Sequence, residues 1–218
     1  MPIRLRTAPM SGPPLPQPSK RWAARPWTPA RRRPSPLRRR HETGTGHHLG
    51  PQKFDYLVNN AGIGIYAPFA ETTEADFDRL MDIHLKGVFF LTQTLLPLIA
   101  DDGRVVNISS GLARFSLSGY AAYAMMKGGV EVLTRYLAKE LASRGIAANT
   151  VAPSAIETDI AGGSVRDDKQ VNDFITSVTA LGRAGVADDI GPAVASLLTE
   201  DNRWINAQRI EISGGMFL

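Results

Sequence analysis

The sequence lacks the residues that several kinds of site require. It contains no cysteine, which excludes disulfide bonds and metal sites built on thiolates. Of the 4 histidines, only His84 lies outside the first 52 residues, so we expect no histidine-cluster metal site in the remainder. No run of roughly eighteen apolar residues occurs, so no membrane-spanning helix is expected. These absences favour a soluble, cytoplasmic protein without a resident metal and without a membrane partner.

Residues 1–52 differ in composition from the rest of the chain. They hold eleven of the 15 prolines and eleven Lys or Arg residues against a single acid, Glu42. Beyond residue 52 there are 14 basic and 20 acidic side chains, so the basic character of the protein belongs to this segment. Proline at this density, without apolar periodicity, cannot build helices or central strands. We therefore expect residues 1–52 to be disordered.

Three origins for this basic segment can be compared. The arginine runs 31–33 and 38–40 would suit a nucleic-acid arm, but no aromatic or groove-fitting element accompanies them, so we expect no specific nucleic-acid partner. The prolines argue against the amphipathic helix of an organelle transit peptide, and no apolar core of a secretion signal is present. Our preferred hypothesis is a frameshift or wrong-start translation of a GC-rich gene. Reading the upstream DNA in the other two frames would test it.

Residues 53–218 alternate short apolar strands with amphipathic helices, a pattern typical of an α/β fold with a parallel sheet. Thr73 can cap the first helix, and Gly145 is a suitable stop for the second. No second domain or internal repeat is visible in this part. The expected strands lie near 55–59, 103–109, 146–151 and 208–212, and the expected helices near 74–100, 119–143 and 188–199.

The most informative residues for chemistry are Tyr123, Lys127 and Ser110. Tyr123 and Lys127 are four residues apart in a predicted helix, so both lie on one face. A cation about 5 Å from a phenol, at an effective dielectric near 20, favours the phenolate by roughly 3 kcal/mol, or about two pKa units. We therefore expect Lys127 to lower the pKa of Tyr123, so that the phenol exchanges protons near neutrality. The Ser110 hydroxyl could hold a substrate carbonyl. The spacing alone is not specific, because any helical tyrosine with a lysine one turn later matches it.

Three further motifs follow in order along the chain. The sequence Asn59-Asn60-Ala61-Gly62 comes after the apolar run 56–58, Val105 to Ser110 reads as a strand, and Asn149 to Pro153 closes another. With the tyrosine and lysine, this order resembles the short-chain dehydrogenase/reductase family from about Lys53 to Leu218. The resemblance implies that residues 53–218 are the C-terminal part of a doubly wound, Rossmann-like parallel sheet, truncated at its N-terminal side.

The resemblance also implies a role for each matching residue. Tyr123 would donate or accept the proton, Lys127 would bind the nicotinamide ribose, and Ser110 would polarise the substrate carbonyl. Asn59, Ala61 and Gly62 would line the adenosine side of the cofactor cleft and steady the central strand. The nicotinamide carboxamide would be faced by Pro153, Ile156 and Thr158.

The implied activity is the interconversion of a ketone and a secondary alcohol with a nicotinamide cofactor. The residue that chooses between NAD and NADP follows a strand that the sequence does not show, so both stay open, with NADP favoured. Family members assemble as dimers or tetramers through segments that match residues 120–141 and 209–218. In the family, the segment matching residues 161–178 is a mobile lid over the substrate.

Two residues depart from the family pattern near the site. His84 stands where the family has a helical asparagine whose backbone carbonyl holds a proton-relay water. With a pKa near 6.5, His84 could relay protons itself, or it could simply be packed between helices. Ser154 stands where glycine normally follows Pro153, so its side chain either crowds the nicotinamide or turns away.

The largest departure concerns the glycine turn that binds the cofactor pyrophosphate. The segment from Thr43 to Gly50 resembles this turn, but His48 occupies a glycine position, three arginines precede it and Pro51 follows it. We therefore expect weak cofactor binding and impaired turnover. The alternative is an inactive remnant of such an enzyme. The strand at 55–59 would lack a neighbour on one side, which would favour non-native association.

Overall fold

The computed structural model describes residues 53–218. The predicted disorder of residues 1–52 and the segment from Thr43 to Gly50 lie outside the described residues. Neither expectation is tested by the structure.

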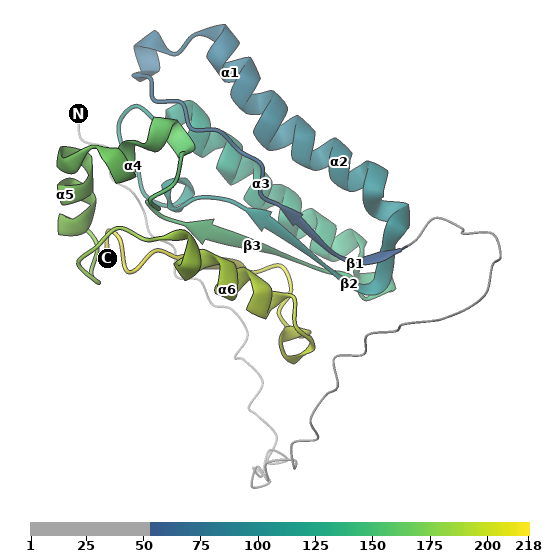
Figure 1. Ribbon diagram of the computed structural model, residues 1–218. Helices are drawn as coiled ribbons and strands as arrows, with labels where there is room; N and C mark the ends of the chain where they lie inside the picture. Colours follow the sequence, from purple (N-terminus) through teal and green to yellow (C-terminus); the bar gives the residue numbers. More distant parts are fainter. Residues whose placement is uncertain (1–52) are drawn as a thin grey trace, which may run out of the picture. The chain divides into compact units, whose positions relative to one another are not determined.

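The described residues form a four-stranded sheet in which all strand pairs are parallel (Figure 1). The order of the strands in the sheet follows the chain, and parallel neighbours require the crossover connections that the helices supply. The predicted α/β class and the four predicted strands are confirmed. The strands are β1 (Phe54–Asn59), β2 (Ile99–Ile108), β3 (Ala147–Pro153) and β4 (Arg209–Ile212).

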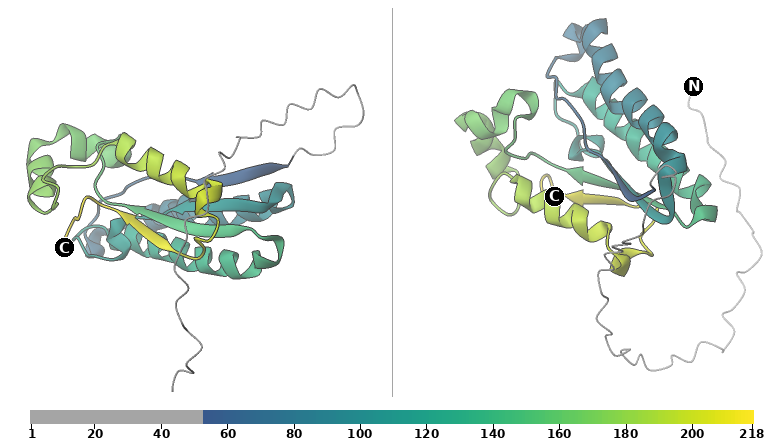
Figure 2. Two further views of the ribbon diagram at one scale, coloured as in Figure 1. Left: turned by 90° about the horizontal axis from the view of Figure 1, so that it is seen from below. Right: turned by 45° about the vertical axis from the view of Figure 1, so that its right-hand side comes forward.

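Helices cover both faces of this sheet, which makes it doubly wound. On one face Leu57 and Val105 pack against Leu137 and Leu141, at the C-terminal end of the longest described helix, α3 (Ala121–Glu140). On the other face Val106 and Val151 pack against Leu197. Figures 1 and 2 show α2 and α3 on the first face and α6 on the second. The main helices are α1 (Glu74–Met81), α2 (Val88–Leu95), α3 (Ala121–Glu140), α4 (Ser164–Asp167), α5 (Lys169–Ser177) and α6 (Ala187–Leu197).

The first predicted helix, near 74–100, begins as expected but ends early. The Thr73 hydroxyl accepts a hydrogen bond from Asp76 N at 3.1 Å, so the predicted cap is confirmed. Between α1 and α2 the chain makes a π-helical segment, Asp82–Gly87, which contains His84. Pro97 lies in the 3₁₀ turn Leu96–Leu98 that follows α2, and β2 begins at Ile99. The helix ends before residue 100 because Pro97 disfavours the helical conformation in the residue before it.

The later helices agree better with their predicted positions. Gly145 follows the 3₁₀ turn Ala142–Arg144 with φ of 68°, a left-handed conformation that glycine adopts without strain, so the predicted stop is confirmed. The expected lid segment, residues 161–178, contains α4 and α5. It begins with a kink at Ala161 and Gly162, both of which have positive φ. Its mobility stays a prediction.

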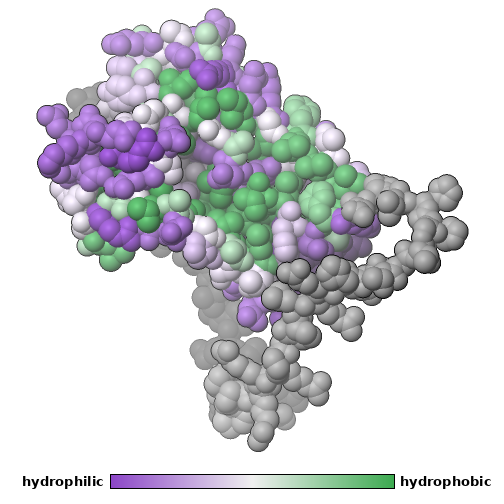
Figure 3. Space-filling view, in the orientation of Figure 1, coloured by the Kyte–Doolittle hydropathy of each residue, from purple (hydrophilic) through white to green (hydrophobic). Residues whose placement is uncertain are grey.

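The outer edge of β1 is open in the described part of the chain. Tyr56 and Val58 point away from the helical face of Leu57, and they are 53% and 38% exposed. The space-filling view shows a continuous hydrophobic area on one face of the molecule (Figure 3). Among residues 53–218, β1 pairs with β2 alone, as expected for a strand without a neighbour on one side. Within residues 53–218, no helix is long and apolar enough to cross a membrane.

Candidate active site

The predicted site residues gather at the carboxyl ends of the parallel strands. Asn59 ends β1, Ser110 follows β2, and Pro153 ends β3. Ser109 N donates to Val151 O at 2.7 Å, which ties the end of β2 to the end of β3. The carboxyl edge of an open parallel sheet is the usual place for ligands in α/β proteins.

Ser110, Tyr123 and Lys127 are all buried and close to one another. They are 7%, 8% and 4% exposed. The Lys127 ammonium lies 5.7 Å from the centre of the Tyr123 ring and donates to Ile108 O at 2.9 Å. The Ser110 hydroxyl is within hydrogen-bonding reach of Tyr123. The structure thus brings together the three residues that were singled out from the sequence.

The pKa of Tyr123 moves in the opposite direction to the one expected. Burial raises it, and the nearby Tyr120 phenol raises it further, whereas the hydrogen bond from Ser110 lowers it. The Lys127 ammonium sits over the ring and is bound to a main-chain carbonyl, and it is not among the groups that shift the pKa of Tyr123. The expected lowering of the pKa of Tyr123 by Lys127 is therefore wrong for this structure.

Lys127 itself is strongly affected by its surroundings. Burial lowers the pKa of Lys127 from 10.5 to about 8, because the charged form is poorly solvated. Within residues 53–218 its ammonium makes one hydrogen bond, to Ile108 O. Two of its three donors therefore remain for a ligand, such as a pair of ribose hydroxyls.

His84 lies directly beside Tyr123 and is 1% exposed. The two rings meet edge to face with 5.3 Å between their centres, and His84 Nε2 donates to Ile63 O at 2.8 Å. His84 Nδ1 is then an acceptor, and it has no hydrogen-bond partner among the described residues.

Burial and the Lys127 charge lower the pKa of His84 from 6.5 to about 4. The ring is therefore neutral at pH 7, which removes the titration near neutrality on which the relay interpretation depended. The packed-histidine alternative agrees better with this environment.

Asn59 uses its side chain to join strands and helices. Its amide donates to Asn107 Oδ1 at 2.7 Å and to Thr92 Oγ1 at 3.0 Å. Asn107 in turn donates to Thr134 Oγ1 at 2.9 Å, so one buried chain of hydrogen bonds joins β1, β2, α2 and α3. The role of Asn59 in steadying a strand agrees with these bonds. The strand it steadies lies at the edge of the described sheet, whereas a central one was expected.

The loop after β1 is open where the cofactor was expected. Ala61 and Gly62 are exposed. A Cβ on Gly62 would lie 2.9 Å from His84 Cε1 and 3.7 Å from Lys127 Nζ, so the backbone passes close to both side chains. The absence of a side chain there is compatible with a ligand that approaches the backbone. A Cβ on Gly64 would lie 3.0 Å from the Cβ of Ala161, so the start of the lid segment passes close to this loop.

The segment after β3 carries the remaining predicted residues. Pro153, Ile156 and Thr158 are half-buried, and Ile156 bridges to Gly185. The Ser154 hydroxyl donates to Ser213 O at 3.1 Å. Its side chain therefore turns toward the residue after β4, the second of the two alternatives considered for this position.

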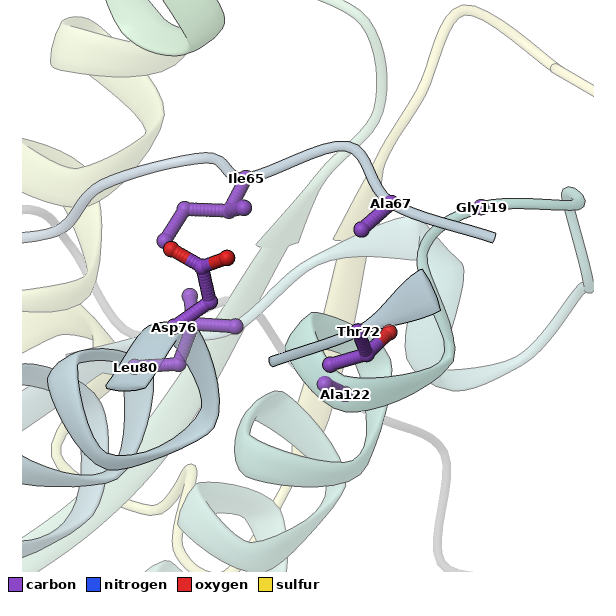
Figure 4. A pocket seen from close by; sticks show the side chains of 7 residues that line it. All are labelled: Ile65, Ala67, Thr72, Asp76, Leu80, Gly119 and Ala122. Carbon is purple, nitrogen blue, oxygen red and sulfur yellow. The ribbon is translucent and has the colours of Figure 1, made fainter. Parts of the chain in front are cut away.

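Two cavities lie close to these residues. A cavity of about 10 Å³, between the loop at Ile65 and Ala67 and the start of α1, is too small for a substrate, and Figure 4 shows its walls. A larger cavity of about 440 Å³ has no charged side chain in its lining. Tyr120, one of its lining residues, has its ring centre 6.4 Å from that of Tyr123. Its walls include Tyr66, Phe69, Leu112, Leu117 and Tyr120.

Several polar residues around the site were missed by the sequence analysis. Glu131 and Arg209 form a partly buried ion pair with an N to O distance of 2.8 Å, and Ser109 hydrogen-bonds to the same carboxylate. Glu131 lies one turn after Lys127 on α3, a signal that could have been used. Arg209 has no such local signal. Residues 53–218 contain no cluster of three or more acidic, histidine or cysteine side chains that could hold a metal.

Comparison with known proteins identifies the family of this chain. The family model described as enoyl-(acyl carrier protein) reductase matches residues 45–217. A short-chain type dehydrogenase/reductase of Picea abies is 35% identical over 175 residues, which are 78% of this chain and 62% of that protein. The 3-oxoacyl-[acyl-carrier-protein] reductase FabG of Thermotoga maritima is 34% identical over 168 residues, which are 76% of this chain and 67% of that protein.

Solved structures show the same relationship. The angucycline C-6 ketoreductase LanV with bound NADP is 34% identical, with a TM-score of 0.72 over 76% of this chain and 63% of that one. The reductase LugOII, which catalyses keto-reduction at C1 during lugdunomycin biosynthesis, is 36% identical, with a TM-score of 0.72 over 76% of this chain and 65% of that one. This chain thus spans about two thirds of the length of such relatives. With this fold, this site and these matches, the chain belongs to the short-chain dehydrogenase/reductase family.

Proposed function

We propose that this chain interconverts a ketone and a secondary alcohol with a nicotinamide cofactor. The observation that carries the proposal is the burial of Ser110, Tyr123 and Lys127 side by side at the carboxyl end of β2 and the start of α3. NADP is favoured over NAD, since LanV was solved with NADP and another relative with NADPH.

Each residue has a distinct part in the proposed reduction. The nicotinamide supplies the hydride when it is bound. Ser110 holds the substrate carbonyl oxygen, and Tyr123 donates its phenolic proton to that oxygen. Because burial raises the pKa of Tyr123, its phenol is protonated at neutral pH, which suits a proton donor. Lys127 binds the cofactor ribose with the donors that its bond to Ile108 O leaves free.

The cofactor would lie across the carboxyl edge of the sheet. Asn59, Ala61 and Gly62 would form its adenosine side. The nicotinamide carboxamide would meet Pro153, Ile156 and Thr158, which follow or end β3. The exposed loop at Ala61 and Gly62 supports this placement, because it leaves the backbone accessible.

The substrate is proposed to be a small uncharged carbonyl compound. The 440 Å³ cavity beside Tyr120 has the volume of a small-molecule site and an uncharged lining. LanV has been solved with rabelomycin, which supports a cyclic ketone as a first substrate to test. We also propose self-association through the outer faces of α2 and α3, where Phe89, Phe90 and Tyr136 are 45%, 56% and 64% exposed.

A second candidate is an inactive remnant of such an enzyme. The observation that favours it is the segment from Thr43 to Gly50, in which His48 stands at a glycine position and after which Pro51 prevents the expected helix. The two candidates differ in whether the chain turns over at all.

Tyr123→Phe tests the proposed mechanism. The assay measures the alcohol formed from 1-tetralone by chromatography at millimolar NADPH, with Tyr136→Phe as the control on the same helix. We expect Tyr123→Phe to abolish product formation without changing NADPH binding, and Tyr136→Phe to keep the parent rate. If Tyr123→Phe kept more than a small fraction of the activity, the proton donor would be another group. If the parent itself formed no alcohol, the remnant would be the better description.

A further inference from the structure

Ser110 and Lys127 belong to different elements of the fold, and their relative position has to be fixed by something other than helix geometry. Ser110 follows β2, whereas Tyr123 and Lys127 lie on α3. The helix sets the spacing of Tyr123 and Lys127, but it does not set the distance from α3 to Ser110. A displacement of about 1 Å in such a site can cost about a hundredfold in rate.

Arg209 of β4 makes contacts toward both of these elements. Its Nε donates to Glu131 Oε1 on α3 at 2.8 Å, and its Nη2 donates to Ser110 O at 3.3 Å. Its Nη1 donates to Glu211 Oε2 at 2.8 Å. Every nitrogen of the guanidinium therefore has a partner, and the planar group is held in one orientation.

Glu131 completes the connection on the helix side. Its Oε1 accepts from the Ser109 hydroxyl at 2.7 Å as well as from Arg209. Ser109 Oγ lies 3.2 Å from the carbonyl oxygen of Lys127, so the same hydroxyl reaches the backbone of the catalytic lysine. The side chains of Glu131 and Arg209 are only 13% and 24% exposed, so water competes weakly for these bonds.

We infer that Arg209 and Glu131 are positioning residues for the reduction, since together they hold the backbone of Ser110 against the backbone of Lys127. This inference rests on the proposed function for its kinetic consequence, but the hydrogen bonds of Arg209 and Glu131 are a property of the fold. Neither side chain touches the phenol of Tyr123 or the ammonium of Lys127 in the hydrogen bonds described, so their effect is indirect.

The chain offers a matched control for an arginine that bridges a carboxylate and main-chain oxygens. Arg144 donates to Asp101 Oδ1 at 2.9 Å, to Leu96 O at 3.0 Å and to Ile99 O. These partners surround the start of β2, at the opposite end of the strand from Ser110. Its side chain is 30% exposed, close to the value for Arg209.

The test compares Arg209→Lys with Arg144→Lys in the full chain. Lysine keeps the charge in both variants but cannot bond to three partners in one plane. We expect Arg209→Lys to lower the rate of 1-tetralone reduction at saturating NADPH by about ten- to a hundredfold, with less than about a threefold change in ketone KM. Arg144→Lys should keep the parent rate, although we expect the melting temperatures of the two variants to fall by similar amounts. Glu131→Gln, which retains an acceptor for Ser109, should lose less activity than Glu131→Ala.

A second measurement does not depend on turnover. The pKa of Lys127 is followed by NMR in protein labelled with ¹³C at the lysine ε carbons, with Lys127→Arg for assignment. Loss of the hydrogen bonds of Arg209 exposes the Lys127 ammonium to water. In Arg209→Lys we therefore expect the pKa of Lys127 to rise from about 8 by about one unit or more. In Arg144→Lys it should not move.

The outcomes separate the inference from the proposed function. An unchanged Lys127 titration in Arg209→Lys overturns the inference, and so does a rate equal to that of Arg144→Lys. A parent that makes no alcohol contradicts the proposed function instead, and the Lys127 titration then decides the inference alone.

Discussion

The neutral, buried state of His84 predicts how stability depends on pH. The pKa of His84 in the folded protein is about 4, below its value of 6.5 in the unfolded chain. Since the unfolded state binds the proton more tightly, the contribution of His84 to stability is fully present above pH 6.5. It is lost as the pH falls toward 4. A shift of this size corresponds to about 3 kcal/mol at most, from about 1.4 kcal/mol for each pKa unit.

His84→Asn isolates this contribution, because asparagine does not titrate. The free energy of unfolding would be measured by urea titration at several values between pH 7.5 and 4.5. We expect the parent to lose about 2 to 3 kcal/mol more than the variant over this range, whatever their difference at pH 7.5. The groups that face His84 are Lys127 and Tyr123. With a pKa of about 8, Lys127 is mostly protonated at pH 7.5 and fully protonated at lower pH, and Tyr123 stays neutral throughout this range.

Other titrating groups do not disturb the comparison. The pKa of Glu211 is lowered to about 2 by Arg114 and Arg209, and the ion pair of Asp189 with Arg183 also lowers the pKa of that carboxyl. Their contributions fall mainly below pH 4.5 and are common to both proteins, as are the histidines of residues 1–52. Parallel pH profiles for the parent and His84→Asn would refute the assignment of a neutral buried histidine.

Three further predictions follow from the loop after β1, the edge of β1 and the cofactor turn. Gly62→Ala places a methyl group 2.9 Å from His84 Cε1, so we expect a loss of about 1 to 3 kcal/mol in a urea titration, and an unchanged stability would mean that the loop yields freely. Val58→Lys puts a charge on the open edge of β1, and it should reduce concentration-dependent association in sedimentation; equal association by the parent would place the contact elsewhere. A pyrophosphate turn supplies about three hydrogen bonds of roughly 1.5 to 3 kcal/mol each, and losing even 5 kcal/mol weakens binding more than a thousandfold. NADPH should therefore bind at millimolar concentration in a fluorescence titration, and saturation at micromolar concentration would show that another part of the chain replaces that turn.

The sequence by itself determined the class of fold and most of the candidate site. Apolar runs near β1, β2 and β3 placed these strands to within a few residues, because a strand buried in a parallel sheet needs a continuous apolar segment. The last strand, β4, alternates charged and apolar residues. The spacing of Tyr123 and Lys127 placed them on one face of α3, because the period of a helix is fixed by its backbone geometry. Local signals also gave the cap at Thr73 and the stop at Gly145. The end of the first predicted helix was placed too late, although Pro97 marks it in the sequence.

Only the tertiary structure decided how those residues behave. The pKa of Tyr123 is raised chiefly by burial, and burial depends on elements distant in the sequence. The same burial makes His84 neutral, and the bonds that turn Ser154 toward Ser213 join β3 to β4. The pair of Glu131 and Arg209 is 78 residues apart along the chain, so no local pattern contains it. Sequence periodicity reports the conformation of each segment, whereas desolvation and long-range hydrogen bonds arise only when the segments pack together.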